Sequence, residues 1–216
     1  MGTDGETIAL DQKLARILVR PLARTALHPN WLTALGLGLG AVAAGLFALG
    51  IERTVQNLAV FVYVLAIFMD HTDGELARMT GKTSRAGHYF DHVQAVFNYT
   101  SVWVGMGIGL AQGHLGATAI WMGIVAGLGC AVIFGARLAL EEIIGSHHVR
   151  QKIKGGVEPE DVLYLLAPVI WLGGIEYLLM AAAIGAPVGA VIVLALAGRD
   201  LLRHRRAAAG TPDRPS

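Results

Sequence analysis

Apolar residues along the chain come in long runs separated by short polar stretches. Each run is close to the roughly 20 residues that a helix needs to cross a bilayer. The runs span residues 31–50, 55–75, 88–111, 116–140, 162–184 and 187–204. This pattern predicts an all-α integral membrane protein with six transmembrane helices.

The boundary between the last two predicted spans has two candidate positions. The sequence IGAP at 184–187 offers a helix-ending glycine and a proline suited to a helix start. Gly173 and Gly174 offer an earlier turn. The first position, which we adopt, places Glu176 within the membrane, whereas the second places it in a loop.

The two ends of the chain differ from the apolar runs. Residues 8–25 mix apolar and basic positions at helical spacing, which predicts an amphipathic helix on the membrane surface within residues 1–30. A helical tail in the cytosol is the alternative. Residues 205–216 are polar and rich in small residues, which predicts a disordered tail. The six-helix membrane domain is therefore expected at 31–204.

Composition and charge agree with a membrane protein. Of the 216 residues 54% are apolar and only 15% are charged, and the mean hydropathy is +0.55. Basic residues gather before span one, between spans two and three, after span four and after span six, and only Arg53 lies on the other side. By the positive-inside rule we expect both termini to be cytoplasmic, and we expect the bacterial inner membrane as the location.

Three aspartates lie near the ends of spans two and three. On a helix that continues span two, Asp70, Asp73 and Ala77 share one face, and on span three Asp91 lies one turn after Gly87. The connection between the two spans is short, so the spans should pack as an antiparallel pair. We therefore expect the three carboxylates to converge at the cytoplasmic end.

Converging carboxylates repel one another and lose hydration near a bilayer. A divalent cation would offset both effects, and oxygen ligands favour Mg²⁺ or Mn²⁺. Gly74 would let a diphosphate approach the backbone, and the small side chain of Ala77 would leave space beside it. Arg78 could pair with phosphate. The pattern suits metal-assisted chemistry on a pyrophosphate-linked substrate.

Two other interpretations of the acids remain open at this point. The carboxylates could form structural ion pairs with Arg78, Lys82 and Arg85. Alternatively, a small ion-coupled transporter or channel could use acids within the membrane as an ion pathway. Such a pathway would spread its acids across the depth of the membrane, whereas these gather at one face.

The segment from Asp70 to Asp91 resembles the signature of the CDP-alcohol phosphotransferase (CDP-alcohol phosphatidyltransferase) family, D-x₂-D-G-x₂-A-R-x₈-G-x₃-D-x₃-D. All seven fixed positions up to the third Asp are present at the right spacing. The stretch HPNWLT at 28–33 is similar to the Pro-Asn-x-x-Thr segment that opens the first span in that family. The six-span layout with an amphipathic N-terminal helix is similar too.

This resemblance implies a phospholipid-biosynthesis transferase that moves a substituted phosphate from a CDP-linked donor to an alcohol acceptor and releases CMP. It also implies a homodimer whose site opens to the cytoplasm and to membrane lipids; no nucleic-acid partner is expected. The implied metal ligands are Asp70, Asp73 and Asp91. The implied nucleotide-binding residues are Gly74, Ala77, Arg78 and Gly87, with Thr80 near them.

The sequence departs from the family at the fourth Asp, which is thought to be the general base and is replaced here by Ala95. His92 and His88 lie on the same helical surface and are candidate substitute bases. The run Phe90-Asp91-His92 also resembles the choline and ethanolamine branch of the family, although that branch keeps the fourth Asp. A relative that binds CDP compounds without turnover is the alternative, and an introduced Asp→Ala change would give the same sequence.

The other histidines suggest no catalytic role. His71 lies between two acids but points elsewhere on the helix. His147 and His148 fall in a predicted cytoplasmic loop, where solvated side chains are the simpler interpretation and a zinc-binding pair is the alternative.

The acceptor site should involve the cytoplasmic ends of the later spans. Arg137 and Arg199 lie there, and relatives with phosphorylated acceptors need such arginines to hold the extra phosphate. Arginines at membrane borders also serve topology and anionic headgroups. The motif does not separate a CDP-diacylglycerol donor from a CDP-choline or CDP-ethanolamine donor.

Overall fold

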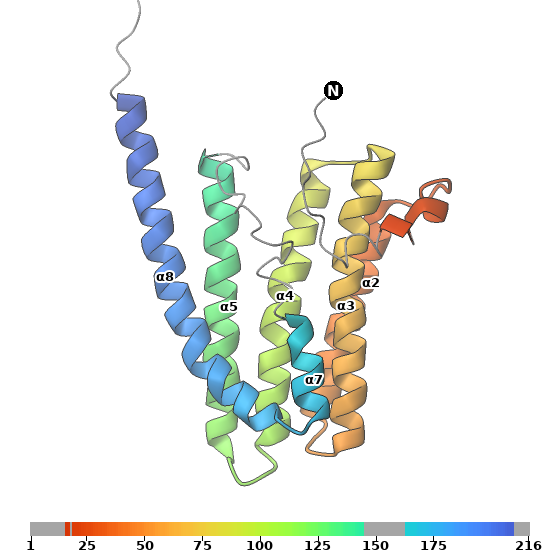
Figure 1. The fold of residues 1–216 in the computed structure, drawn as a ribbon, viewed down its shortest axis with the longest axis vertical. Helices are drawn as coiled ribbons and strands as arrows, with labels where there is room; N and C mark the ends of the chain where they lie inside the picture. Colours follow the sequence, from red (N-terminus) through yellow and green to blue (C-terminus); the bar gives the residue numbers. More distant parts are fainter. Residues whose placement is uncertain (1–15, 18, 145–162, 210–216) are drawn as a thin grey trace, which may run out of the picture.

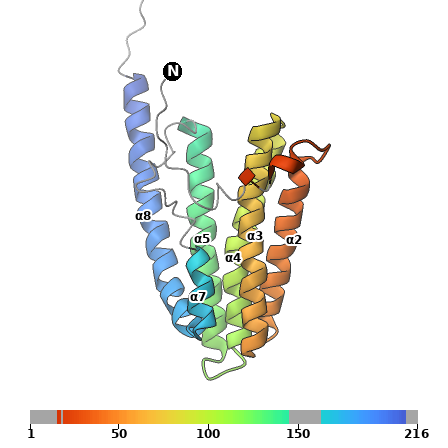
Figure 2. The same ribbon diagram turned by 45° about the vertical axis from the view of Figure 1, so that its right-hand side comes forward.

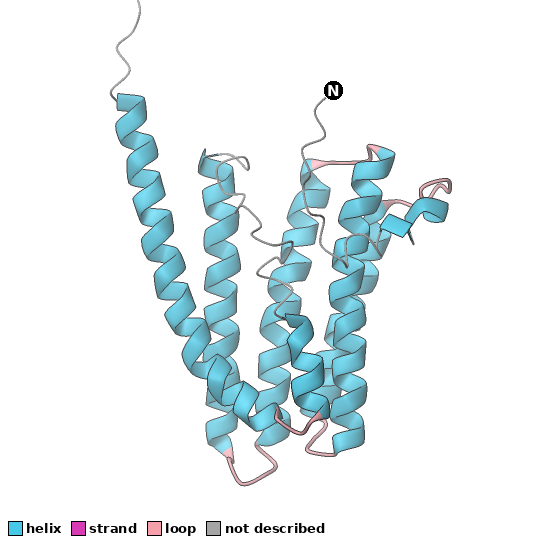
Figure 3. Cartoon of the chain, viewed as in Figure 1, coloured by secondary structure: helices cyan, strands magenta, loops and turns pink. Residues whose placement is uncertain are grey.

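The computed structural model describes residues 16–17, 19–144 and 163–209, and within these ranges the chain forms helices joined by turns and loops, with no strand (Figure 3). The all-α prediction is confirmed for this part of the chain. The helices are α2 (Pro29–Ala48), α3 (Arg53–Thr80), α4 (Arg85–Leu110), α5 (Ala117–Ile144), α7 (Leu166–Trp171) and α8 (Ile175–Ala209).

The five long helices run side by side along the length of the molecule (Figures 1 and 2). Helix α2 packs against both α3 and α4, and α5 packs against both α4 and α8, whereas α3 and α4 contact each other at few positions. The short helix α7 lies against α3 at the end where α3 begins (Figure 1). The end of α3 and the start of α4 therefore meet at the opposite end of the bundle.

Four of the described helices, α2, α3, α5 and α8, are long and apolar enough to cross a membrane. Helix α4 has 26 residues, which is long enough, but its first turns carry Arg85, His88, Asp91 and His92. Large apolar side chains cover the outside of α8, such as Val191 at 68% exposure. A surface of this kind is expected where lipid replaces water.

The boundary that we adopted at 184–187 is wrong. The turn lies at the alternative position, where Gly173 has a φ of +87°, and α8 then runs unbroken through Pro187. The described part of the predicted span 162–184 therefore consists of α7, this turn and the start of α8. Residues 145–162 lie outside the described ranges, so the count of six spans stays a prediction.

Helix α8 keeps Pro187 in its interior where it packs on α5. A Cβ atom at Gly129 of α5 would lie 2.7 Å from the carbonyl carbon of Ala186, so only glycine allows this approach. Small residues at such a contact let two membrane helices come close together. The resulting packing stabilises a helix that the proline alone would interrupt.

The N-terminal segment packs on the bundle. Residues 16–17 and 19–22 are helical, and Val19 is fully buried in a small cluster with Leu32 of α2 and Leu76 of α3. The predicted amphipathic helix at 8–25 is helical in these residues, while 8–15 lie outside the described ranges. At the other end of the chain α8 continues to Ala209, so residues 205–209 of the predicted disordered tail are helical, while 210–216 lie outside the described ranges.

Glycines set the distances between α2, α4 and α5. A Cβ atom at Gly105 of α4 would collide with the backbone carbonyl of Ala44 on α2. Across the other face of α4, a Cβ atom at Gly123 of α5 would collide with the carbonyl of Trp103. These contacts fix how α4, which carries the third motif Asp, is held between its neighbours.

Candidate functional site

Local capping sets where α3 ends and where α4 begins, at the same end of the bundle. Helix α3 ends at Gly81, whose φ of +66° suits glycine. Helix α4 begins after Ser84, whose hydroxyl accepts a hydrogen bond from the Gly87 N–H at 2.9 Å. The short connection between them brings Asp73 of α3 and Asp91 of α4 close enough for their charges to interact. Convergence of Asp70 with these two stays a prediction.

Asp73 is the most enclosed of the three aspartates. Its side chain is buried, with 3% exposure, lies against Thr33 of α2 and faces the charge of Asp91 on α4. Its Oδ2 atom is buried and has no hydrogen-bond partner among the described residues. Asp70 and Asp91 are half-buried. A buried carboxylate oxygen without a partner, next to a second carboxylate, is suited to a hard divalent cation such as Mg²⁺ or Mn²⁺.

The start of α2 lies beside Asp73 and the start of α4. His28 caps the helix by accepting the Asn30 N–H at Nδ1, and Pro29 occupies its first turn. A Cβ atom at Gly87 would lie 3.2 Å from Oδ1 of Asn30, which is tighter than ordinary contact. Gly87 therefore allows α4 to approach the Pro-Asn segment of α2 closely.

Gly74 differs from Gly87 because the fold does not require a glycine there. A Cβ atom at Gly74 would lie 3.5 Å from Nη1 of Arg78, which is ordinary van der Waals contact. Gly74 lies within a helix, where glycine is intrinsically unfavourable. Its missing side chain leaves the backbone next to Asp73 accessible to a ligand.

Arg78 is held in place by a neighbour that the motif does not specify. Its Nε and Nη2 atoms lie 3.0 and 2.9 Å from Oε2 of Glu75, whose side chain is only 6% exposed. Arg16 donates from Nε to the other carboxylate oxygen of Glu75 at 2.6 Å. Glu75 therefore ties the N-terminal segment to Arg78, which remains 57% exposed and able to contact a ligand.

The other predicted nucleotide-binding positions lie on the same helix. Ala77 is half-buried, one turn after Asp73. The Thr80 hydroxyl donates to the Leu76 carbonyl of its own helix at 2.7 Å. Ala95, at the position of the fourth family Asp, is half-buried and packs against the main apolar core.

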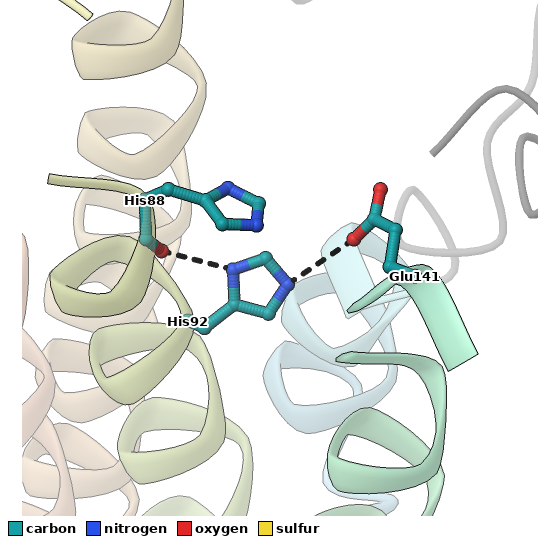
Figure 4. A group of neighbouring side chains, drawn as sticks. All are labelled: His88, His92 and Glu141. Carbon is teal, nitrogen blue, oxygen red and sulfur yellow. Dashed lines mark hydrogen bonds and ion pairs between the residues drawn. The ribbon is translucent and has the colours of Figure 1, made fainter. Parts of the chain in front are cut away.

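His92 and His88 lie on one face of α4, opposite Glu141 of α5 (Figure 4). His92 Nδ1 lies 3.0 Å from the backbone carbonyl of His88, and its Nε2 lies 3.6 Å from Oε2 of Glu141. The two imidazole rings meet edge to face with their centroids 4.4 Å apart. Both candidate bases are thus in contact with each other, and Glu141 was not among the predicted site residues.

The predicted acceptor arginines lie on the later helices. Arg137 is exposed on α5, one turn before Glu141 and therefore on the same side of the helix. Arg199 is exposed on the last part of α8. His71, which we expected to point away from the acids, contacts Tyr164, with Nδ1 3.2 Å from the phenolic oxygen.

Three residues of this region were not among the predicted site residues. Thr33 belongs to the Pro-Asn-x-x-Thr stretch, so the sequence did carry a signal for it. Glu75 occupies a variable position of the motif, and Glu141 lies far along the chain on α5. Glu75 forms a local pair with Arg78, three residues further along the same helix. No local pattern marks Glu141, because its contact with His92 depends on which helices pack together.

The comparisons with known proteins identify a family. A family model described as CDP-alcohol phosphatidyltransferase matches residues 26–198, from the start of α2 into the last part of α8. No curated protein matches the chain significantly.

Proposed function

Because the chain belongs to the CDP-alcohol phosphatidyltransferase family, we propose that it transfers a substituted phosphate from a CDP-linked donor to an alcohol acceptor, with release of CMP. The family is one of phospholipid-synthesis enzymes. The observation that supports the proposal most strongly is the buried Asp73 carboxylate, which faces Asp91 beside the bare backbone of Gly74.

We assign the metal ion of the reaction to Asp70, Asp73 and Asp91. A bound Mg²⁺ or Mn²⁺ would supply positive charge against the diphosphate of the donor. Gly74 and Ala77 leave room for the diphosphate, and the exposed guanidinium of Arg78 is oriented by Glu75 to pair with a phosphate oxygen.

The proton of the acceptor hydroxyl requires a group other than residue 95, because alanine cannot accept it. We assign this role to His92, with His88 beside it. A carbonyl oxygen can only accept, so the contact with the His88 carbonyl places the proton on Nδ1 of neutral His92 and leaves a lone pair on Nε2. That lone pair is available to accept a proton.

The acceptor is expected between this histidine pair and the arginines of the later helices. Arg137 projects from the same side of α5 as Glu141, so an acceptor with its own phosphate could be held there. Arg199 on α8 is the second candidate. We also propose a homodimer in the inner membrane, as the family resemblance implies. The acids are assigned to the cytoplasmic side, because the basic residues gather at that end.

A second candidate function rests on Ala95. A protein that keeps the metal and CDP site but lacks the usual base could bind CDP compounds without turnover. The two candidates differ in catalysis and agree in binding, so binding of CMP alone does not separate them.

The test is a radiolabelled transfer assay on purified protein in lipid with Mg²⁺ or Mn²⁺. It pairs CDP-diacylglycerol with small polar alcohols, and CDP-choline or CDP-ethanolamine with diacylglycerol. We expect transfer in one of the two pairings and a loss of at least about 100-fold in Asp73→Asn, because a metal ligand contributes several kcal/mol to the transition state. Binding of CMP and Mg²⁺ without transfer would favour the second candidate.

A further inference from the structure

The cluster of His88, His92 and Glu141 has the composition of a transition-metal site. Each residue offers one ligand atom, and these atoms all lie within 4.8 Å of one another. The two histidines are four residues apart on α4, so their rings project from one face, as in helical zinc-binding motifs. Two histidines and one glutamate also form a known three-residue ligand set for zinc with an open fourth position.

The orientation of His92 is the one that a metal ligand needs. Its Nδ1–H donates to the backbone carbonyl of His88 at 3.0 Å, and Nε2 points toward the carboxylate of Glu141 (Figure 4). Histidines that bind metals almost always donate their other ring N–H in this way, which fixes the tautomer and the ring orientation.

The spacing between the two helices also fits a shared ion. Nε2 of His92 and Oε2 of Glu141 are 3.6 Å apart, which is too long for a hydrogen bond. Two ligands about 2.1 Å from a tetrahedral zinc ion lie about 3.4 Å apart, so little movement is needed. His88 is exposed and has room to turn its ring toward the same point.

The cluster adjoins an open pocket of about 610 Å³, lined by Arg85, His88, Glu141, Glu142 and Ile143. An ion held by three side chains would keep a position open for a water molecule or a ligand from this pocket. Arg85, which lies over the ring of Tyr89 with 5.9 Å to its centroid, and Glu142 give the rest of this pocket one positive and one negative charge.

We propose that His88, His92 and Glu141 bind one Zn²⁺-type transition-metal ion, separately from the Mg²⁺ or Mn²⁺ expected at Asp70, Asp73 and Asp91. Imidazole ligands favour Zn²⁺, whereas an all-carboxylate set favours Mg²⁺ and Mn²⁺. The proposal concerns binding and does not rest on the proposed transfer activity.

The experiment titrates Zn²⁺ into untagged protein in lipid nanodiscs by calorimetry, with excess Mg²⁺ present to occupy the carboxylate site. Co²⁺ then replaces Zn²⁺, and its visible absorption reports the coordination geometry. We expect one Zn²⁺ per chain and a tetrahedral Co²⁺ spectrum. The variants His88→Ala, His92→Ala and Glu141→Gln should each weaken binding at least tenfold. His114→Ala is the matched control, because His114 also lies near a glutamate, with Nδ1 3.7 Å from Oε1 of Glu176.

Several results would overturn the proposal. One is no Zn²⁺ binding at all, and another is binding that survives both His92→Ala and Glu141→Gln. Loss of binding in a His147→Ala, His148→Ala double variant with no loss in His92→Ala would assign the ion to that pair instead. Loss in Asp73→Asn alone would assign it to the carboxylate site. Circular dichroism of each variant checks that the helices remain formed.

Discussion

The carboxylate of Glu141 on α5 faces the ring of His92 on α4, with Oε2 3.6 Å from Nε2. This contact adds a glutamate to the histidine pair that we propose as the substitute for the missing Asp at position 95. The same nitrogen atom serves both of our assignments, since Nε2 of His92 is the proposed proton acceptor and a proposed zinc ligand. The two roles exclude each other, because a lone pair that binds a metal cannot accept a proton.

Zinc should therefore inhibit transfer. With Mg²⁺ in excess, added Zn²⁺ is expected to lower the transfer rate of the unmodified protein. In Glu141→Gln the inhibition constant should rise at least tenfold, with each rate compared with that of the same variant without zinc. Ala95→Asp restores the usual base, so this variant should keep a larger fraction of its transfer rate in Zn²⁺ than the unmodified protein does. Equal inhibition of all three proteins would show that zinc acts elsewhere.

Glu75→Gln should weaken donor binding more than catalysis. Glu75 holds Arg78 through contacts of 2.9 and 3.0 Å, and a neutral amide would orient this guanidinium less firmly. We expect KM for the CDP donor to rise about tenfold, with kcat changed by less than about threefold.

Arg16→Ala is the control for Glu75→Gln, because Arg16 contacts the same carboxylate but leaves the contact with Arg78 in place. Steady-state kinetics of both variants give the answer. A rise in KM with Arg16→Ala as large as with Glu75→Gln would show that Glu75 acts through the N-terminal segment and not through Arg78.

Asp73→Asn should stabilise the metal-free protein while removing activity. The substitution eliminates a buried charge that faces Asp91, and buried like charges destabilise a fold. Without divalent cations Tm is expected to rise. With Mg²⁺ and CMP the unmodified protein should gain stability by linkage, and the variant should gain much less. A lower Tm of the variant in EDTA would contradict this account of the acids.

Gly105→Ala should destabilise the bundle, because the added Cβ atom collides with the Ala44 carbonyl of α2. The collision is with backbone, so helices must move apart, at a cost of about 1–3 kcal/mol. Gly38→Ala is the matched control, since a Cβ atom there has open space, and its Tm should stay unchanged or rise because alanine favours a helix over glycine. Thermal unfolding in the same detergent compares the two, and equal Tm values would disprove the close packing of α2 on α4.

The sequence predicted the helices and the meeting of the motif residues because both depend on local information. Apolar runs mark the helices, and the spacing from Asp70 to Asp91 places the carboxylates at one end of two consecutive helices. Local information did not predict the position of the turn before α8. Pro187 looked like a helix start, but close packing of α8 on Gly129 keeps the helix continuous there.

The contacts that reach this region from other parts of the chain could not be predicted from local patterns. Glu141 reaches His92 because α5 packs on α4, and Arg16 reaches Glu75 because the N-terminal segment folds back on α3. Such contacts follow from the arrangement of the helices in space.

The most direct test of the proposed function compares transfer rates of the unmodified protein, His92→Ala and Ala95→Asp under the same conditions. The account predicts measurable transfer by the unmodified protein and a loss of at least about 100-fold in His92→Ala, which is within the usual contribution of a general base. It also predicts faster transfer in Ala95→Asp. Transfer by none of the three, together with no stabilisation by CMP and Mg²⁺, would contradict it.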